Sequence, residues 1–217
     1  MLQGHPLRAR IVLAGLTAFI LAAVAAGVGS LGAYAARHDR ELRVGQQSTV
    51  LRVYRPFKGT RMNPALHVRR RVKGFCWTGS DAAFRRRDAW RCIWGGRYIV
   101  DPCFSGPSRS IRYVLCPDQA WDNGVKQLRL NRSLPVHNDN TQKLGSVWAI
   151  VTTGGLRCKR QTGQIPSVAG KPLLYDCGKR GAFAGEPDTR RPLWTILFSP
   201  AAHPKRFSRT GIATAWR

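Results

Sequence analysis

Six cysteines lie between Cys76 and Cys177 in this 217-residue chain, and they constrain its fold more than any other feature. Their number is even, and no two of them form a C-x-x-C pair, the spacing typical of zinc and redox sites. Disulfides persist mainly in oxidising compartments, so the pattern predicts an exported domain stapled by disulfide bonds.

The residues between neighbouring cysteines favour sequential pairing. Each pair encloses a stretch of glycine, proline, serine or arginine, as the loop of a β-hairpin would. The predicted pairs are Cys76 with Cys92, Cys103 with Cys116, and Cys158 with Cys177. Each bridge would close the base of one hairpin and stabilise the folded chain by about 3 kcal/mol in the chain-entropy model.

An uncharged stretch over residues 11–36 precedes the cysteines. It follows two arginines and ends with Ala33 and Ala35, which have the spacing that signal peptidases cleave. Its length also suffices for an apolar helix that crosses a bilayer. Residues 1–36 are therefore expected to be a cleaved signal peptide or a retained signal anchor, with one N-terminal apolar helix in either case.

Charges on the two sides of this stretch argue against export. Arg37, Arg40 and Arg43 follow it and outnumber Arg8 and Arg10 before it, which favours a cytoplasmic C-terminal side. The cysteine pattern outweighs this count, because a reducing compartment would leave six thiols unexplained. The predicted location is the cell membrane, as a single-pass protein with its C-terminal domain outside, or the secreted fraction.

Short segments rich in β-branched or aromatic residues fill the rest of the chain. Each is bounded by Gly, Pro, Asn or Asp, and none continues into a sustained helical pattern. The segments are 49–54, 72–77, 89–94, 97–100, 111–115, 126–130, 147–152, 172–176, 193–198 and 211–216. Gly95 and Gly96 would form a two-residue hairpin turn. We expect an all-β sandwich or small barrel of about nine short strands, stapled by disulfides.

The expected organisation has three parts. These are the signal peptide or anchor over 1–36, a basic linker with a possible first strand over 37–71, and an extracytoplasmic disulfide-rich β domain over 72–217. Residues 37–73 hold the densest run of positive charge. This run is interpreted as a solvated, membrane-proximal arm rather than a dedicated recognition site.

Aromatic residues within the predicted strands are candidates for the core. The tryptophans expected there are Trp77, Trp90, Trp148, Trp194 and Trp216. Trp90 and Tyr175 each stand two residues before a cysteine, on the same face of the strand, and are expected to pack over its disulfide.

Several cysteine- and tryptophan-containing motifs are informative as a set. They are Gly74-Phe75-Cys76-Trp77-Thr78-Gly79-Ser80, Asp88-Ala89-Trp90-Arg91-Cys92, Asp101-Pro102-Cys103-Phe104, Leu115-Cys116-Pro117, Tyr175-Asp176-Cys177-Gly178, Pro192-Leu193-Trp194-Thr195 and Thr214-Ala215-Trp216. With these motifs, residues 70–217 resemble a family of uncharacterised, secreted or membrane-anchored, six-cysteine actinobacterial proteins. The resemblance implies an extracytoplasmic domain in a thick, anionic cell envelope, and it implies no catalytic residue.

The charge balance predicts an anionic partner. The chain has 36 Lys and Arg against 11 Asp and Glu, a net charge of +25. Such a field attracts anionic polymers and membrane surfaces without sequence specificity, although a coding bias toward arginine is an alternative source of part of the excess. The candidate anion-binding residues are Arg85, Arg86, Arg87, Lys159, Arg160, Lys205, Arg206 and Arg209. We expect a non-catalytic envelope domain that binds an anionic polymer or a partner protein, and each of these residues singly also fits a solvated loop.

Two other functions stay open. A secreted hydrolase of an envelope polymer would need a base among His67, His137 and His203, or two suitably placed carboxylates. The candidate carboxylates are Asp88, Asp101, Asp118, Asp122 and Asp176. A membrane-tethered cytoplasmic nucleic-acid binder follows if the downstream arginines set the topology. The sequence contains no G-x-S-x-G, H-E-x-x-H or Walker motif, and we predict no catalytic residue, metal site or cofactor.

Overall fold

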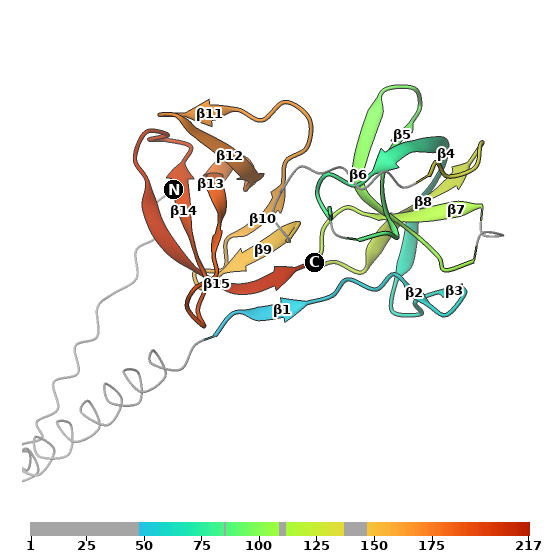
Figure 1. Ribbon diagram of the computed structural model, residues 1–217, viewed down its shortest axis with the longest axis horizontal. Helices are drawn as coiled ribbons and strands as arrows, with labels where there is room; N and C mark the ends of the chain where they lie inside the picture. The colour runs from blue at the N-terminus through green and yellow to red at the C-terminus, as the bar shows by residue number, and fades with distance from the viewer. Residues whose placement is uncertain (1–47, 85, 109–111, 137–146) are drawn as a thin grey trace, which may run out of the picture. The chain divides into compact units, whose positions relative to one another are not determined.

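Strands dominate the protein, as predicted. The computed structural model describes residues 48–84, 86–108, 112–136 and 147–217 (Figure 1). The predicted apolar helix over 11–36 lies outside these residues. The described residues belong to one compact unit, Gln47–Arg217. Among them there is no helical segment with the length and hydropathy of a membrane span.

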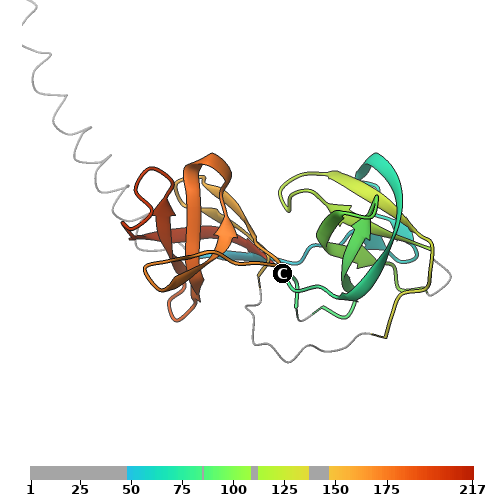
Figure 2. The same cartoon turned by 90° about the horizontal axis from the view of Figure 1, so that it is seen from above.

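Five strands form a closed barrel, called here the first barrel (Figure 2). They are β4 (His67–Gly79), β5 (Ala89–Trp94), β6 (Tyr98–Ser105), β7 (Tyr113–Pro117) and β8 (Gly124–Leu130). Each strand pairs antiparallel with the next, and β8 closes the ring by pairing parallel with β4. The parallel pair is a consequence of the odd number of strands, because direction alternates along a meander.

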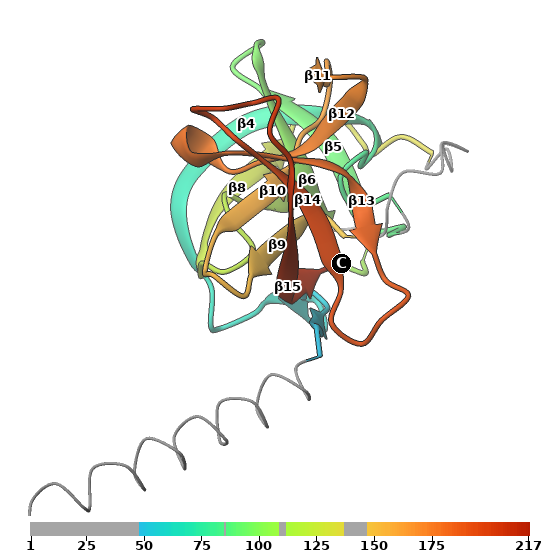
Figure 3. The same cartoon turned by 90° about the vertical axis from the view of Figure 1, so that its left-hand side faces the viewer.

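Six further strands form a second ring, called here the second barrel (Figure 3). They are β9 (Ala149–Thr152), β10 (Arg157–Arg160), β12 (Lys171–Asp176), β13 (Gly181–Asp188), β14 (Thr195–Pro200) and β15 (Ser208–Trp216). All neighbours are antiparallel, and β15 closes the ring onto β9. An even number of strands allows this closure without a parallel pair.

Short elements complete the chain. They are β1 (Val50–Arg52), β2 (Phe57–Lys58), β3 (Arg61–Met62), β11 (Ser167–Val168) and the 3₁₀ turn η1 (Gly178–Arg180). β1 confirms the strand predicted over 49–54 and pairs parallel with β15. Thr49 anchors it: its hydroxyl donates to the carbonyl of Ile212 at 2.6 Å and accepts from the amide of Trp194 at 2.8 Å.

Alternate residues of the strands fill the cores. Trp90, Val114 and Leu128 pack with four of the cysteines in the first barrel. Residues of the second barrel form another core, which includes Ile150, Tyr175, Phe183 and Ile212. A third cluster combines residues from both barrels and contains the rings of Tyr54, Phe104 and Trp148, whose centroids lie 5.3–6.2 Å apart.

All six cysteines are bridged, and the predicted sequential pairing is confirmed. The bridges are Cys76–Cys92, Cys103–Cys116 and Cys158–Cys177. The first two staple the β4–β5 and β6–β7 hairpins. The third joins Cys158 of β10 to Cys177, just after β12. The segment between them contains β11, so it is more than a hairpin loop. Trp90 and Tyr175 share a core cluster with the cysteines that follow them, as predicted.

The structure contains more strands than the sequence predicted. Each predicted segment overlaps an observed strand, and 89–94 matches β5 residue for residue. The segments missed were β10, β13 and three strands of two residues each. β10 reads Arg-Cys-Lys-Arg and β13 reads Gly-Ala-Phe-Ala-Gly-Glu-Pro-Asp, so neither has the β-branched content that marks a strand. β4 begins at His67, inside the range predicted as a basic linker, so the charge run over 67–73 belongs to a barrel strand rather than to an arm.

Two local predictions were wrong. Gly95 and Gly96 do adopt positive φ angles, but Trp94 pairs with Tyr98, so the β5–β6 connection has three residues rather than two. Trp77 is 38 % exposed instead of buried. The other four predicted tryptophans are buried, or partly buried in the case of Trp194. Trp77 lies at the register shift between Cys76 and Thr78 and directly follows Cys76, which is buried, so strand alternation directs the Trp77 side chain outward.

Candidate anion-binding site

Ion pairs occupy most of the carboxylates that the structure describes. They are Arg69–Asp122, Arg86–Asp88, Arg91–Asp81, Lys126–Asp118, Arg160–Glu186, Arg190–Asp188 and Arg209–Asp188. Four of the carboxylates considered for catalysis therefore have other evident roles: three pair with cations, and Asp176 accepts from the Gly178 amide at 2.9 Å. Because cations greatly outnumber acids, many exposed arginines and lysines remain available to an external anion.

Two of the predicted anion-binding residues serve the fold instead. The guanidinium of Arg160 is only 1 % exposed, where it pairs with Glu186 and donates to the hydroxyl of Tyr175 at 3.2 Å. Arg86 pairs with Asp88, donates to the carbonyl of Tyr54 and lies 4.4 Å from the centre of the Phe104 ring. In both arginines, guanidinium N–H groups donate to partners within the protein.

The other predicted residues that the structure describes are exposed but are not gathered in one pocket. Arg87 and Arg209 line two different pockets. Lys159 lies on β10, and Lys205 and Arg206 lie in the turn before β15, outside the pockets described below. Arg85 falls outside the described residues.

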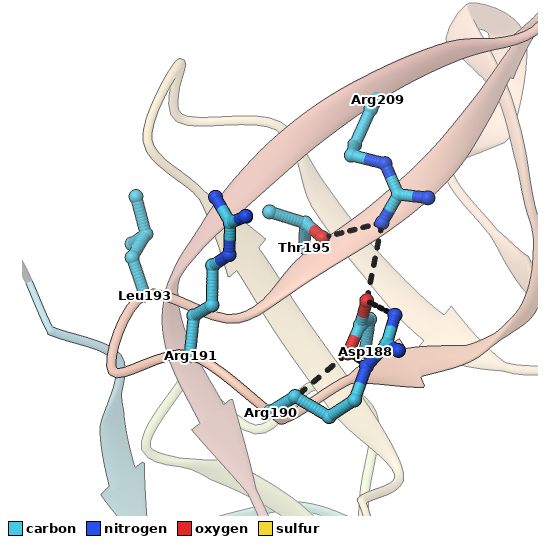
Figure 4. Close-up of a pocket in the computed structure, with 6 residues that line it drawn as sticks. All are labelled: Asp188, Arg190, Arg191, Leu193, Thr195 and Arg209. Atoms are coloured by element: carbon cyan, nitrogen blue, oxygen red, sulfur yellow. Dashed lines mark hydrogen bonds and ion pairs between the residues drawn. The ribbon is translucent and has the colours of Figure 1, made fainter.

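An arginine-lined pocket of about 500 Å³ lies where β13, β14 and β15 meet (Figure 4). It is called here the arginine pocket, and its lining residues are Asp188, Arg190, Arg191, Leu193, Thr195 and Arg209. The β13–β14 turn supplies Arg190 and Arg191, while the pairing of β14 with β15 brings Arg209 beside Thr195. Residues nearly twenty positions apart are thereby collected around one carboxylate.

Hydrogen bonds fix two of the three guanidinium groups. Asp188 accepts from Nε and Nη2 of Arg190 at 2.9 and 2.7 Å, and from Nη1 of Arg209 at 3.4 Å. The same Nη1 donates to the Thr195 hydroxyl at 2.9 Å. The hydrogen bonds from Arg190 and the charge of Arg209 hold the pKa of Asp188 well below its usual range, so this carboxylate stays ionised.

The pocket carries a net positive charge. One carboxylate faces three guanidinium groups, each of which offers five N–H donors. Asp188 occupies only part of them, and among the residues that the structure describes Arg191 has no carboxylate within ion-pair distance. A planar guanidinium fork matches the oxygens of a phosphate or carboxylate, so the arrangement can receive one such group between Arg191 and Arg209.

Sequence reasoning found only Arg209 of this set. The signal that could have found the rest is the dibasic pair Arg190-Arg191, placed between Asp188 and Pro192 in a turn between two strands. Its relation to Arg209 depends on strand pairing, which the sequence does not display.

Comparison of the chain with known protein families, with curated proteins and with solved structures finds no match. The site must therefore be interpreted from its own geometry.

The features expected of a hydrolase are not gathered in the described pockets. Among the residues lining the three pockets there is no histidine, and no pocket has two carboxylates. His67 and His203 are exposed, and His137 lies outside the described residues. The described residues also contain no cluster of three or more potential metal ligands.

Proposed function

We propose that the protein is a non-catalytic, extracytoplasmic domain that binds an anionic group of a cell-envelope polymer in the arginine pocket. The observation that carries this proposal is the convergence of three guanidinium groups on a pocket with a single, already paired carboxylate. The three disulfides support an oxidising, extracytoplasmic setting.

The internal carboxylate contributes by preorganising the site. Three free guanidinium groups would repel one another and sample many rotamers before a ligand arrived. Asp188 and Thr195 hold Arg190 and Arg209 in place, so less side-chain entropy is lost when an anion binds. A phosphate or carboxylate can then bind to Arg191 and to the remaining donors of Arg209.

The test measures binding of inorganic phosphate by calorimetry to the wild-type chain and to Arg191→Gln/Arg209→Gln. A charge-assisted hydrogen bond contributes about 1.5 kcal/mol or more, so affinity is expected to fall about tenfold for each arginine removed. The matched control is Lys205→Gln/Arg206→Gln, which removes the same charge from exposed positions in the turn before β15. An equal loss in both variants would show general charge attraction and would contradict a defined site.

A further inference from the structure

A second group of cations lies on the outer face of the first barrel, on the neighbouring strands β4, β8 and β7. Arg71 and Lys73 of β4, Arg129 of β8, and Arg112 just before β7 line a groove of about 510 Å³. The other lining residues are Val72, Tyr113 and Gln127. None of the seven is acidic. Unlike the arginine pocket, this groove has no carboxylate to neutralise it.

Strand register places these cations in rows. Lys73 lies opposite Arg129, which lies opposite Tyr113 on the other side. Arg71 lies opposite Gln127 and donates to its side-chain oxygen at 3.1 Å. Successive outward positions on one strand are about 6.6 Å apart, and neighbouring strands about 4.8 Å. The positive charges therefore repeat at short intervals on a rigid sheet.

The carboxylates in the loop between β7 and β8 are already paired. Asp122, just before β8, accepts from Arg69 at 2.7 and 2.8 Å, and Asp118 pairs with Lys126.

The groove continues into a second pocket through Arg112, which lines both. The second pocket measures about 790 Å³, and Arg87 and Arg132 also line it. Its one acidic residue, Asp88, is held by Arg86. Together Arg71, Lys73, Arg129, Arg112, Arg87 and Arg132 form a path, called here the cation track, that exceeds the size of a single phosphate or carboxylate. A ligand that uses the whole track must carry repeated charges.

The aromatic residues that line the groove and the second pocket favour a polymer without bases. Binding of single-stranded nucleic acid depends on bases stacking on accessible rings. Tyr113 is half-buried and packs against Phe57, with ring centroids 5.9 Å apart, and Trp90 is 6 % exposed. The guanidinium groups, in contrast, suit bidentate contacts to phosphate oxygens.

We propose that the cation track binds the chain of a linear phosphate-bearing polymer. This inference rests on the proposed function and deepens it: the arginine pocket binds one anionic group, and the track supplies the affinity that grows with polymer length.

The experiment measures the salt dependence of binding of long-chain inorganic polyphosphate to the full chain. The track variant is Arg71→Gln/Arg112→Gln/Arg129→Gln, and the matched control is Lys171→Gln/Lys179→Gln/Arg180→Gln, three exposed residues outside both pockets. Each lost phosphate contact lowers the slope of log affinity against log salt by about 0.7, so the track variant should lose about 2 from the slope while the control loses little. Unfolding midpoints of both variants verify that they fold.

Each outcome decides one of the two proposals. If the track variant retains wild-type phosphate affinity but loses the polyphosphate slope, the track is supported. If its slope equals that of the control, the track is refuted, whatever the arginine pocket does. If Arg191→Gln/Arg209→Gln binds phosphate as tightly as the wild type, while the track variant still loses the polyphosphate slope, the proposed function fails and the track stands. Tighter binding of single-stranded DNA than of polyphosphate of equal charge, lost in the track variant, would overturn the assignment to a polymer without bases.

Discussion

Asp101→Asn should stabilise the protein at alkaline pH and lose that advantage in acid. The Asp101 carboxylate, on β6, is half-buried beside the loop that follows β4, where it accepts from the hydroxyl of Ser80 and from the amide of Asp81 at 3.0 Å. Burial raises its pKa to about 7, in spite of these hydrogen bonds, and the charge of Asp81 adds to the increase. Burial therefore destabilises the ionised form of this carboxyl group relative to its protonated form.

The sign and size of the stability difference between the variant and the wild type follow from the linkage between protonation and folding. Between pH of about 4 and 7 the folded chain holds a proton that the unfolded chain has released, so the Asp101 contribution to the free energy of unfolding falls as pH rises. Because its pKa is raised from about 4 to about 7, ionisation of Asp101 lowers the free energy of unfolding by at most about 4 kcal/mol. Asparagine cannot ionise, and its amide can donate to Ser80 while its oxygen accepts from Asp81, so the variant avoids this loss.

Urea unfolding followed by tryptophan fluorescence, with the disulfides intact, measures the difference at several pH values. The variant should gain up to about 4 kcal/mol on the wild type between pH of about 4 and 8. Asp176→Asn, at an exposed turn, controls for the loss of one negative charge from a cationic protein. A difference between Asp101→Asn and wild type that does not change with pH would refute the raised pKa, and a change of opposite sign would mean that the carboxylate is stabilised.

Three further predictions concern the fold. Arg160→Met should lower the free energy of unfolding by about 2 kcal/mol, because it removes the buried guanidinium that Tyr175 and Glu186 contact, whereas Lys159→Met should not; chemical unfolding measures both. Gly74→Ala should cost about 3 kcal/mol or prevent folding, since a Cβ would lie 2.0 Å from the Ile93 carbonyl oxygen, while Gly154→Ala meets nothing closer than 3.9 Å. A non-reducing peptide map of protein from its native host should recover the three bridges and no free thiol, and alkylation of all six cysteines without reduction would contradict the oxidising compartment.

Local features of the sequence sufficed for much of the fold. A high content of β-branched and aromatic residues between turn-forming residues located most strands, because such side chains pack well on a pleated, half-buried surface. The disulfides could be paired because their partners are 13–19 residues apart and turn-forming residues separate them. Trp90 and Tyr175 were assigned to their disulfides because side chains two residues apart lie on the same face of a strand.

The local sequence did not show which of the cationic residues are buried and paired and which are exposed to solvent. Arg160 and Lys159 are neighbours in a charged tetrapeptide, yet strand geometry turns one into the barrel and the other to solvent. Arg86 has a similar sequence context to Arg87, but only Arg86 reaches the Tyr54 carbonyl. A positive side chain carries no local mark of its partner, so burial and pairing depend on strands that are distant in the sequence.

The sequence by itself determined an all-β, disulfide-stapled chain with a large positive charge. Tertiary structure decided that the strands close into two rings, because closure depends on long-range register such as the pairing of His67 with Gly124 and of Ala149 with Trp216. It also decided where the positive charge is concentrated. The arginine pocket needs β14 beside β15, and the cation track needs β8 between β4 and β7. Alternation specifies the face of a residue within its own strand, whereas only the pairing of strands specifies its neighbours.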